Sequence, residues 1–295
     1  MQDPQAALKQ LKPRHDFLIA IDSDGCVFDT MEIKQKECFI PTTIKMWNLQ
    51  PISKYVRTAS EFVNLYSQWR GANRFPALVK VFELLAEWPE VRKRNVTIPD
   101  VRPLREWIEN ESMLGNPALQ AEVEKTGDPV LSQTLRWSNA VNAAVEDMIS
   151  SLPPFQHVRE ILKETSQWAD IIVCSGTPGD ALVREWAENG IDTFPLIIAG
   201  QEMGKKAEHL TLVKGKYPEG GILMIGDAPG DLKAAKDNHL LFYPVNPGHE
   251  EDSWKHFHEK VADIFRRGCY NAEYKKKLIY EFEALLPAEP PWKKS

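Results

Sequence analysis

The hydrophobic positions of the chain include several short, uninterrupted runs rich in β-branched residues. Each run is followed closely by Gly, Ser, Asp or Pro. Runs of this kind are typical of strands that are buried on both faces of a parallel sheet. Three runs show the pattern most clearly, at 18–21, 171–174 and 221–225, and two further candidate strands lie at 195–199 and 240–245.

Helical patterns of a dozen or so residues separate the later runs, at 179–189, 206–216 and 230–238. Gly190 follows the first of them, where a glycine commonly ends a helix. Strand and helix therefore alternate from about 154 to 245, which predicts βαβ units with right-handed crossovers. The fold class expected from this pattern is α/β, with a Rossmann-like parallel sheet.

The segment 31–152 has a different pattern, with amphipathic helical stretches, frequent prolines and almost no strand-like run. It predicts a large all-helical cap domain inserted into an α/β core formed by residues 1–30 and 153–250. We expect hinges for this insertion near 28–30 and 152–154. The remaining segment, 251–295, predicts a C-terminal helical extension that packs on the core.

Composition and charge narrow the class of protein. The chain has 295 residues, 43% of them hydrophobic, and a net charge of −6 with no basic stripe, so we expect no nucleic-acid partner. No apolar run approaches the 18 or so residues of a membrane helix, and the first residues do not form a signal peptide. The four scattered cysteines are interpreted as reduced thiols. We expect a cytoplasmic monomer or homodimer.

Polar residues follow three of the predicted strands. Asp22, Ser175 and Asp227 come at or just after the strand ends, and Asp24 and Asp231 lie close by in the sequence. Ligands of parallel sheets bind beyond the carboxyl ends of the strands, so these side chains should share one edge. Carboxylates at close range repel unless a cation lies among them, and an oxygen-only set favours Mg²⁺.

Individual motifs at this edge have competing interpretations. Asp22 and Asp24 project from the same side of an extended segment, so one carboxylate can attack phosphorus while the other transfers the proton of the leaving group. The same Asp-x-Asp-Gly pattern also occurs in surface turns and calcium-binding loops. Ser175-Gly176-Thr177 precedes a helix and can hold phosphate oxygens or simply cap that helix. Of Lys205 and Lys206, one can neutralise a phosphate while the other stays solvated.

Taken in order, these motifs resemble those of the haloacid dehalogenase-like (HAD) superfamily of hydrolases. Asp22-Ser23-Asp24-Gly25 resembles the first motif, Ser175 the second, Lys205 or Lys206 the third and the 226–231 segment, GDAPGD, the fourth. The resemblance covers about 15–30 and 154–245, and the helical insertion lies where that superfamily places a cap. It implies a Rossmann-like fold, Mg²⁺ as cofactor and an aspartyl-phosphate intermediate.

The resemblance also implies a role for each matched residue. Asp22 would be the nucleophile and a metal ligand, and Asp24 the general acid and base, binding the metal through its backbone carbonyl. Asp227 would be the third metal ligand, supported by Asp231. Ser175 would bind phosphate and Lys206 would stabilise charge, with Lys205 as the alternative lysine.

The expected function is a phosphomonoester phosphatase acting on a small organic phosphate. Members of this superfamily that cleave carbon–halogen bonds lack the second aspartate of the first motif, so the presence of Asp24 favours phosphoryl transfer. A phosphomutase, a phosphonate-cleaving hydrolase and, from another class, a non-catalytic binding protein on the same core stay as alternatives. In the cap, Arg70 and Arg74 flank a glycine between two helical patterns and are candidate contacts for an anionic substrate, or else solvated arginines.

Overall fold

The computed structural model describes residues 3–150 and 152–293, and the chain divides into two compact units. One is Met1–Met31 with Ser151–Leu286, and the other is Glu32–Ser150 with Pro287–Ser295. The division differs from the sequence analysis at the C-terminus. There the described residues 287–293 group with the helical unit, whereas the whole 251–295 extension was expected to pack on the core.

The first unit is built on a five-stranded parallel sheet with the strand order β3-β2-β1-β4-β5, which confirms the predicted α/β class. In this sheet Ile19 of β1 pairs with Ile171 of β2 and with Leu223 of β4. Every residue of β1, β2 and β4 is buried, which explains why these strands are apolar at each position. The strands are β1 Leu18–Ile21, β2 Asp170–Cys174, β3 Ile197–Ala199, β4 Ile222–Gly226 and β5 Leu241–Pro244.

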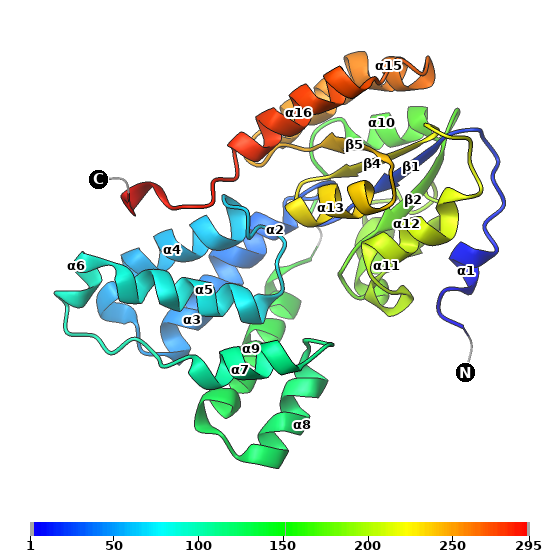
Figure 1. The fold of residues 1–295 in the computed structure, drawn as a ribbon. Helices are drawn as coiled ribbons and strands as arrows, with labels where there is room; N and C mark the ends of the chain where they lie inside the picture. The colour runs from blue at the N-terminus through cyan, green and yellow to red at the C-terminus, as the bar shows by residue number, and fades with distance from the viewer. Residues whose placement is uncertain (1–2, 151, 294–295) are drawn as a thin grey trace. The chain divides into compact units, whose positions relative to one another are not determined.

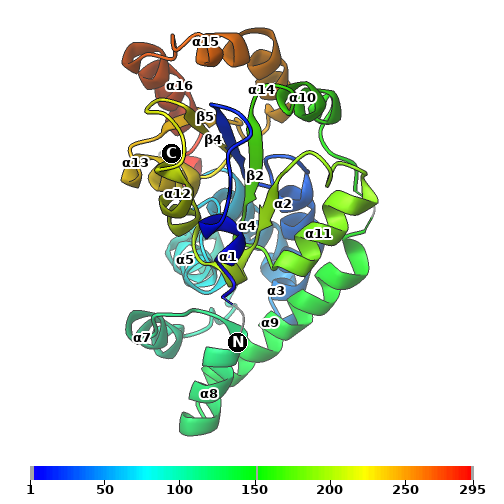
Figure 2. The ribbon, with the colours of Figure 1, turned by 90° about the vertical axis from the view of Figure 1, so that its right-hand side faces the viewer.

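Helices cover both faces of this sheet, as Figure 2 shows. Because strand side chains alternate between the faces, Ile19 packs with Trp186 in one apolar cluster, whereas Ala20 packs with Leu210 and Phe282 in another. The helices of the unit are α1 Ala6–Lys9, α10 Val158–Thr165, α11 Gly179–Glu188, α12 Lys206–Lys214, α13 Pro229–Asp237, α14 Glu250–His256, α15 Ala262–Arg266 and α16 Ala272–Ala284. A π-helix, Phe257–Val261, joins α14 to α15.

The second unit contains helices and, within its described residues, no strand of the sheet. The chain enters it through α2 Thr30–Ile33 and a π-helix, Lys34–Phe39. Side-chain caps begin two of its helices, because Asn73 accepts a hydrogen bond from the Phe75 amide and Asp128 accepts from two amides of α9. The other helices, seen in Figure 1, are α3 Ile40–Met46, α4 Ser53–Leu65, α5 Arg74–Glu87, α6 Pro89–Arg92, α7 Arg102–Asn110, α8 Asn116–Thr126 and α9 Pro129–Met148.

The last described residues pack within this helical unit. The Trp292 ring stacks on Trp88 with centroids 4.3 Å apart and planes 6° apart, and its edge meets Phe62 at 5.5 Å. Lys293 Nζ lies 2.7 Å from Glu87 Oε2. These contacts give the segment 287–293 an aromatic anchor. Across the described residues, no helix is long and apolar enough to span a bilayer.

Candidate functional site

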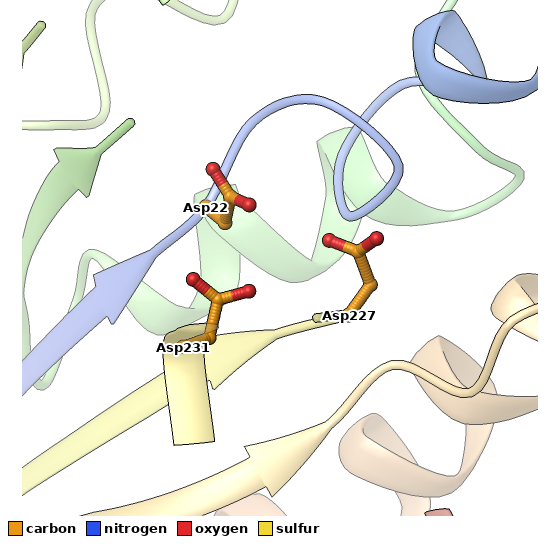
Figure 3. Close-up of side chains that lie close together, drawn as sticks. All are labelled: Asp22, Asp227 and Asp231. Atoms are coloured by element: carbon orange, nitrogen blue, oxygen red, sulfur yellow. The ribbon is translucent and has the colours of Figure 1, made fainter. Parts of the chain in front are cut away.

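The site lies at the carboxyl ends of the central strands. Asp22 directly follows β1, and its amide donates a hydrogen bond to the Ile225 carbonyl at 3.0 Å, which continues the pairing with β4. Asp227 directly follows β4, and Asp231 lies in the first turn of α13. The side chains of Asp22, Asp227 and Asp231 are buried, and each offers an oxygen within 4.8 Å of the other two. Figure 3 shows the three carboxylates gathered around one space.

A single ammonium group joins two of these carboxylates. Lys206 is the first residue of α12, and its Nζ lies 2.6 Å from Asp22 Oδ2 and 2.6 Å from Asp231 Oδ1. Burial lowers the pKa of Lys206, but the two carboxylates outweigh that effect and raise it, so the group stays protonated. Lys205 precedes the helix and is exposed. The structure therefore brings Lys206 to the candidate nucleophile and leaves Lys205 at the surface.

Asp231 is held by the backbone as well as by Lys206. Its Oδ2 accepts a hydrogen bond from the Ala228 amide at 3.1 Å, which caps α13. The residue that ends β4 must be small here, since a Cβ on Gly226 would lie 2.5 Å from the Asp231 side chain. The glycine lets the carboxylate of Asp231 lie directly over the strand end, where it meets Lys206.

Negative charge is concentrated in this cluster. Three buried carboxylates lie close together, and burial raises the pKa of Asp22 well above its usual range. Lys206 opposes this rise, whereas Asp231 and Asp227 add to it. A divalent cation would stabilise such a group of carboxylates, and a set of carboxylate oxygens is the donor set that Mg²⁺ prefers. The residues present therefore fit a magnesium ion.

Asp24 lies in a tight loop that leaves β1. Gly25 adopts a positive φ of 76°, and its amide donates to the Phe28 carbonyl at 2.8 Å, so the chain turns back at once. The two oxygens of the Asp24 carboxyl accept hydrogen bonds from different hydroxyls, those of Thr30 and Thr177, the latter at 2.6 Å. These two hydroxyls orient the second candidate carboxyl.

Two indoles fix the same loop. Trp186 Nε1 donates to Ser23 Oγ at 2.9 Å, and Trp254 Nε1 donates to the Cys26 carbonyl at 2.7 Å. Both rings are fully buried. Sequence reasoning missed these contacts and the role of Thr30, because nothing in the local pattern links residues so far apart. The sequence signal that could have found them is a tryptophan in a segment predicted to be helical, because a buried indole N–H usually finds a hydrogen-bond acceptor.

Ser175, Gly176 and Thr177 follow β2, which neighbours β1 in the sheet. The Ser175 amide donates to the Ala199 carbonyl at 3.0 Å, and Ser175 Oγ accepts from the Thr177 amide at 3.1 Å. Ser175 is buried, whereas a Cβ on Gly176 would meet nothing within 4 Å. The serine hydroxyl thus caps its own turn, and the Thr177 hydroxyl reaches Asp24.

The two cap arginines that the sequence singled out lie in the helical unit. Arg70 is buried and its Nη1 donates to the Leu65 carbonyl at 3.0 Å. Arg74 begins α5, donates to Asn142 Oδ1 at 2.6 Å and lies over the Phe39 ring at 5.1 Å from its centroid. Neither is a solvated surface arginine. Their contact with substrate stays a prediction.

Comparison with known proteins returned matches among solved structures, whereas no family model and no curated protein sequence matched. A HAD-superfamily hydrolase of subfamily IA from Geobacter sulfurreducens is 15% identical, with a TM-score of 0.39 over 78% of this chain and 88% of that one. A haloacid dehalogenase-like family protein from Streptococcus pneumoniae is 12% identical, with a TM-score of 0.39 over 81% and 90%.

A third match, a HAD-hydrolase from Bacillus subtilis bound to magnesium, is 13% identical, with a TM-score of 0.42 over 78% of this chain and 86% of that one. Each of these three matches covers more than three quarters of this chain.

Proposed function

We propose that the protein is a magnesium-dependent phosphohydrolase that cleaves small organic phosphate monoesters with Asp22 as its nucleophile. The observation that carries this proposal is the contrast between two neighbouring carboxyls. Asp22 bonds to the ammonium of Lys206 within a cluster of acids, whereas Asp24 bonds to the neutral hydroxyls of Thr30 and Thr177. Two carboxyls in different environments suit two different roles, attack and proton transfer.

In the first step, a carboxylate oxygen of Asp22 attacks phosphorus and the bond from phosphorus to the ester oxygen breaks. The Asp24 carboxyl gives its proton to that departing oxygen, which leaves as an alcohol. In the second step, Asp24 takes a proton from a water molecule that attacks the aspartyl phosphate. Inorganic phosphate leaves, and both carboxyl groups return to their starting states.

The surrounding residues have supporting roles in this scheme. Lys206 stabilises the negative charge of Asp22 and of the phosphoryl oxygens, and Ser175 is the candidate hydrogen-bond donor to those oxygens. Asp22, Asp227 and the backbone carbonyl of Asp24 would hold the magnesium ion, and Asp231 keeps Lys206 in place. When bound, Mg²⁺ supplies positive charge that lets an anionic carboxylate approach an anionic phosphate.

The test begins with a panel of phosphomonoesters, assayed with Mg²⁺ and with a chelator. Asp22→Asn should abolish hydrolysis, by about 10³-fold or more, and should prevent trapping of beryllium fluoride at the site. Asp192→Asn is the matched control, because Asp192 is exposed and lies outside the site. Substantial hydrolysis by the Asp22→Asn variant at saturating Mg²⁺ would show that another group attacks phosphorus.

A further inference from the structure

The N-terminal segment, residues 3–11, packs along α12, the helix that begins with Lys206. Figures 1 and 2 show its short helix, α1, beside α12. Leu8 of α1 is fully buried, in one apolar cluster with Leu210 and Val213 of α12. The proposed chemistry gives this segment no role, although it contacts the element that carries the lysine of the site.

Gln5 joins this segment to the turn that leads into α12. Its Nε2 donates a hydrogen bond to the Met203 carbonyl at 2.9 Å. Leu8 lies one helical turn further along, so its burial in the core holds the Gln5 side chain at this turn. Gly204 follows with a positive φ of 111°, a conformation that favours glycine, and α12 then starts at Lys206. The Gln5 amide group is therefore bound to the backbone just before that lysine.

The same turn also contacts the residues that follow β2. It begins with a short 3₁₀-helix, Gln201–Met203. The Gln201 amide donates to the Thr177 carbonyl at 3.0 Å, and Glu202 Oε2 accepts from the Gly179 amide at 2.9 Å. Thr177 is the residue whose hydroxyl donates to the second candidate carboxyl. A displacement of this 3₁₀-helix would therefore disturb both the lysine and the acid of the proposed site.

We propose that Gln5 is a positioning residue for the phosphohydrolase, because its hydrogen bond to Met203 fixes the turn that places Lys206 at the nucleophile. The kinetic part of this inference rests on the proposed function. Lys206 Nζ lies 2.6 Å from Asp22 Oδ2 and 2.6 Å from Asp231 Oδ1, so a small shift of the helix start lengthens both contacts. Charge stabilisation by the lysine counts most in the transition state, so the loss should fall on kcat.

The kinetic test uses full-length variants and the best substrate of the phosphomonoester panel. Gln5→Met keeps the length of the side chain but removes the donor. Its kcat should fall by about 3–10-fold, the effect of losing one hydrogen bond, with KM nearly unchanged. Gln5→Lys, whose ammonium donates to the same carbonyl, should recover most of that loss. Gln10→Met is the matched control, because Gln10 is an exposed glutamine of the same segment and its variant should keep wild-type kinetics.

Urea unfolding shows whether each variant is folded under the assay conditions, so that a loss of kcat is not mistaken for a loss of folded protein. A folded Gln5→Met variant with wild-type kcat would overturn the proposal, and so would an equal loss in Gln10→Met. A loss that Gln5→Lys does not recover would overturn it as well, because the hydrogen bond would then not be the cause.

Amide hydrogen exchange keeps this inference separate from the proposed function. The Gly204 and Glu208 amides donate hydrogen bonds of 3.1 and 2.8 Å within this turn. Both should exchange faster in Gln5→Met than in the wild type or in Gln10→Met. If the wild type hydrolysed no phosphomonoester, the proposed function would fail. Faster exchange would then still support the control of this turn by Gln5, and unchanged exchange would overturn it.

Discussion

Thr177 Oγ1 donates a hydrogen bond to Asp24 Oδ2 across 2.6 Å, joining two residues that are 153 positions apart in the sequence. The two side chains meet because β1 and β2 are adjacent and parallel, so the loops that follow them lie side by side. The sequence analysis assigned Thr177 to phosphate binding. In the structure its hydroxyl orients the carboxyl that we propose as the general acid.

This contact predicts a selective effect of removing the Thr177 hydroxyl. Thr177→Val should lower kcat by about 10–100-fold for alkyl phosphates, since a misplaced acid protonates a poor leaving group badly. Activated aryl phosphates need little protonation and should lose much less. Steady-state kinetics on both substrate types gives the comparison, and Thr177→Ser, which keeps the hydroxyl, should retain most activity. Equal losses for both types would mean that Thr177 serves phosphate binding instead.

The contact between Gly226 and Asp231 predicts a steric defect. A Cβ at position 226 would lie 2.5 Å from the Asp231 side chain, so Gly226→Ala should displace that carboxylate from Lys206 and from the Ala228 amide. We expect a loss of about 1–3 kcal/mol in the free energy of unfolding, measured in urea, together with lower activity.

Gly230→Ala is the control for that experiment. A Cβ there meets nothing within 4 Å, and position 230 lies in α13, where alanine is favoured over glycine. This variant should be as stable as the wild type or more stable. If Gly226→Ala left both stability and activity unchanged, the close packing of Asp231 on the strand end would have no functional role.

The aromatic anchor of the C-terminal segment predicts a local stability effect. Trp292→Ala removes the stack on Trp88 and the edge contact with Phe62, and should destabilise the helical unit by about 1–2 kcal/mol. The rate of amide hydrogen exchange should rise in α4 and α6 and stay unchanged in the strands of the sheet. Lys293→Met removes the exposed ion pairs with Glu87 and Glu289 but leaves the Trp292 ring in place, and should change stability by less than about 1 kcal/mol. Unchanged exchange in α4 and α6 would contradict the anchor.

His209 predicts a dependence of stability on pH. The side chain is fully buried, and burial lowers its pKa below the usual value of 6.5. As pH falls below about 6.5, the unfolded chain binds a proton that the native protein does not, so the free energy of unfolding falls. The slope approaches ~1.4 kcal/mol per pH unit for this one group until the lowered native pKa is reached.

Urea unfolding at several pH values between 7.5 and 5.5 measures this slope. His209→Gln should reduce this slope, whatever the absolute stability of the variant. Glutamine does not titrate, so the unfolded chain no longer binds a proton at position 209 that the native state lacks. His239→Asn is the control, since His239 is exposed and asparagine tolerates its positive φ of 60°. A slope in His209→Gln equal to that of the wild type would assign the acid sensitivity to other groups, such as His256, whose pKa burial also lowers.

The sequence by itself determined the strands of the sheet and the residues at their ends. Apolar runs such as 18–21 and 171–174 are typical of a strand buried on both faces, and their positions match β1 Leu18–Ile21 and β2 Asp170–Cys174. Once these strands are parallel, the residues that follow them must share one edge. The meeting of Asp22 with Asp227 therefore follows from local pattern and one topological rule.

Only the tertiary structure decided which side chains meet across that edge. The sequence favoured Lys206 but left Lys205 open as the alternative, and the orientation of α12 on the sheet is what brings Lys206 to Asp22 and leaves Lys205 exposed. The same holds for Thr177 on Asp24 and for Trp292 on Trp88. Local periodicity records which face of an element is buried, but not which distant side chain it will meet, because that depends on the packing of whole elements.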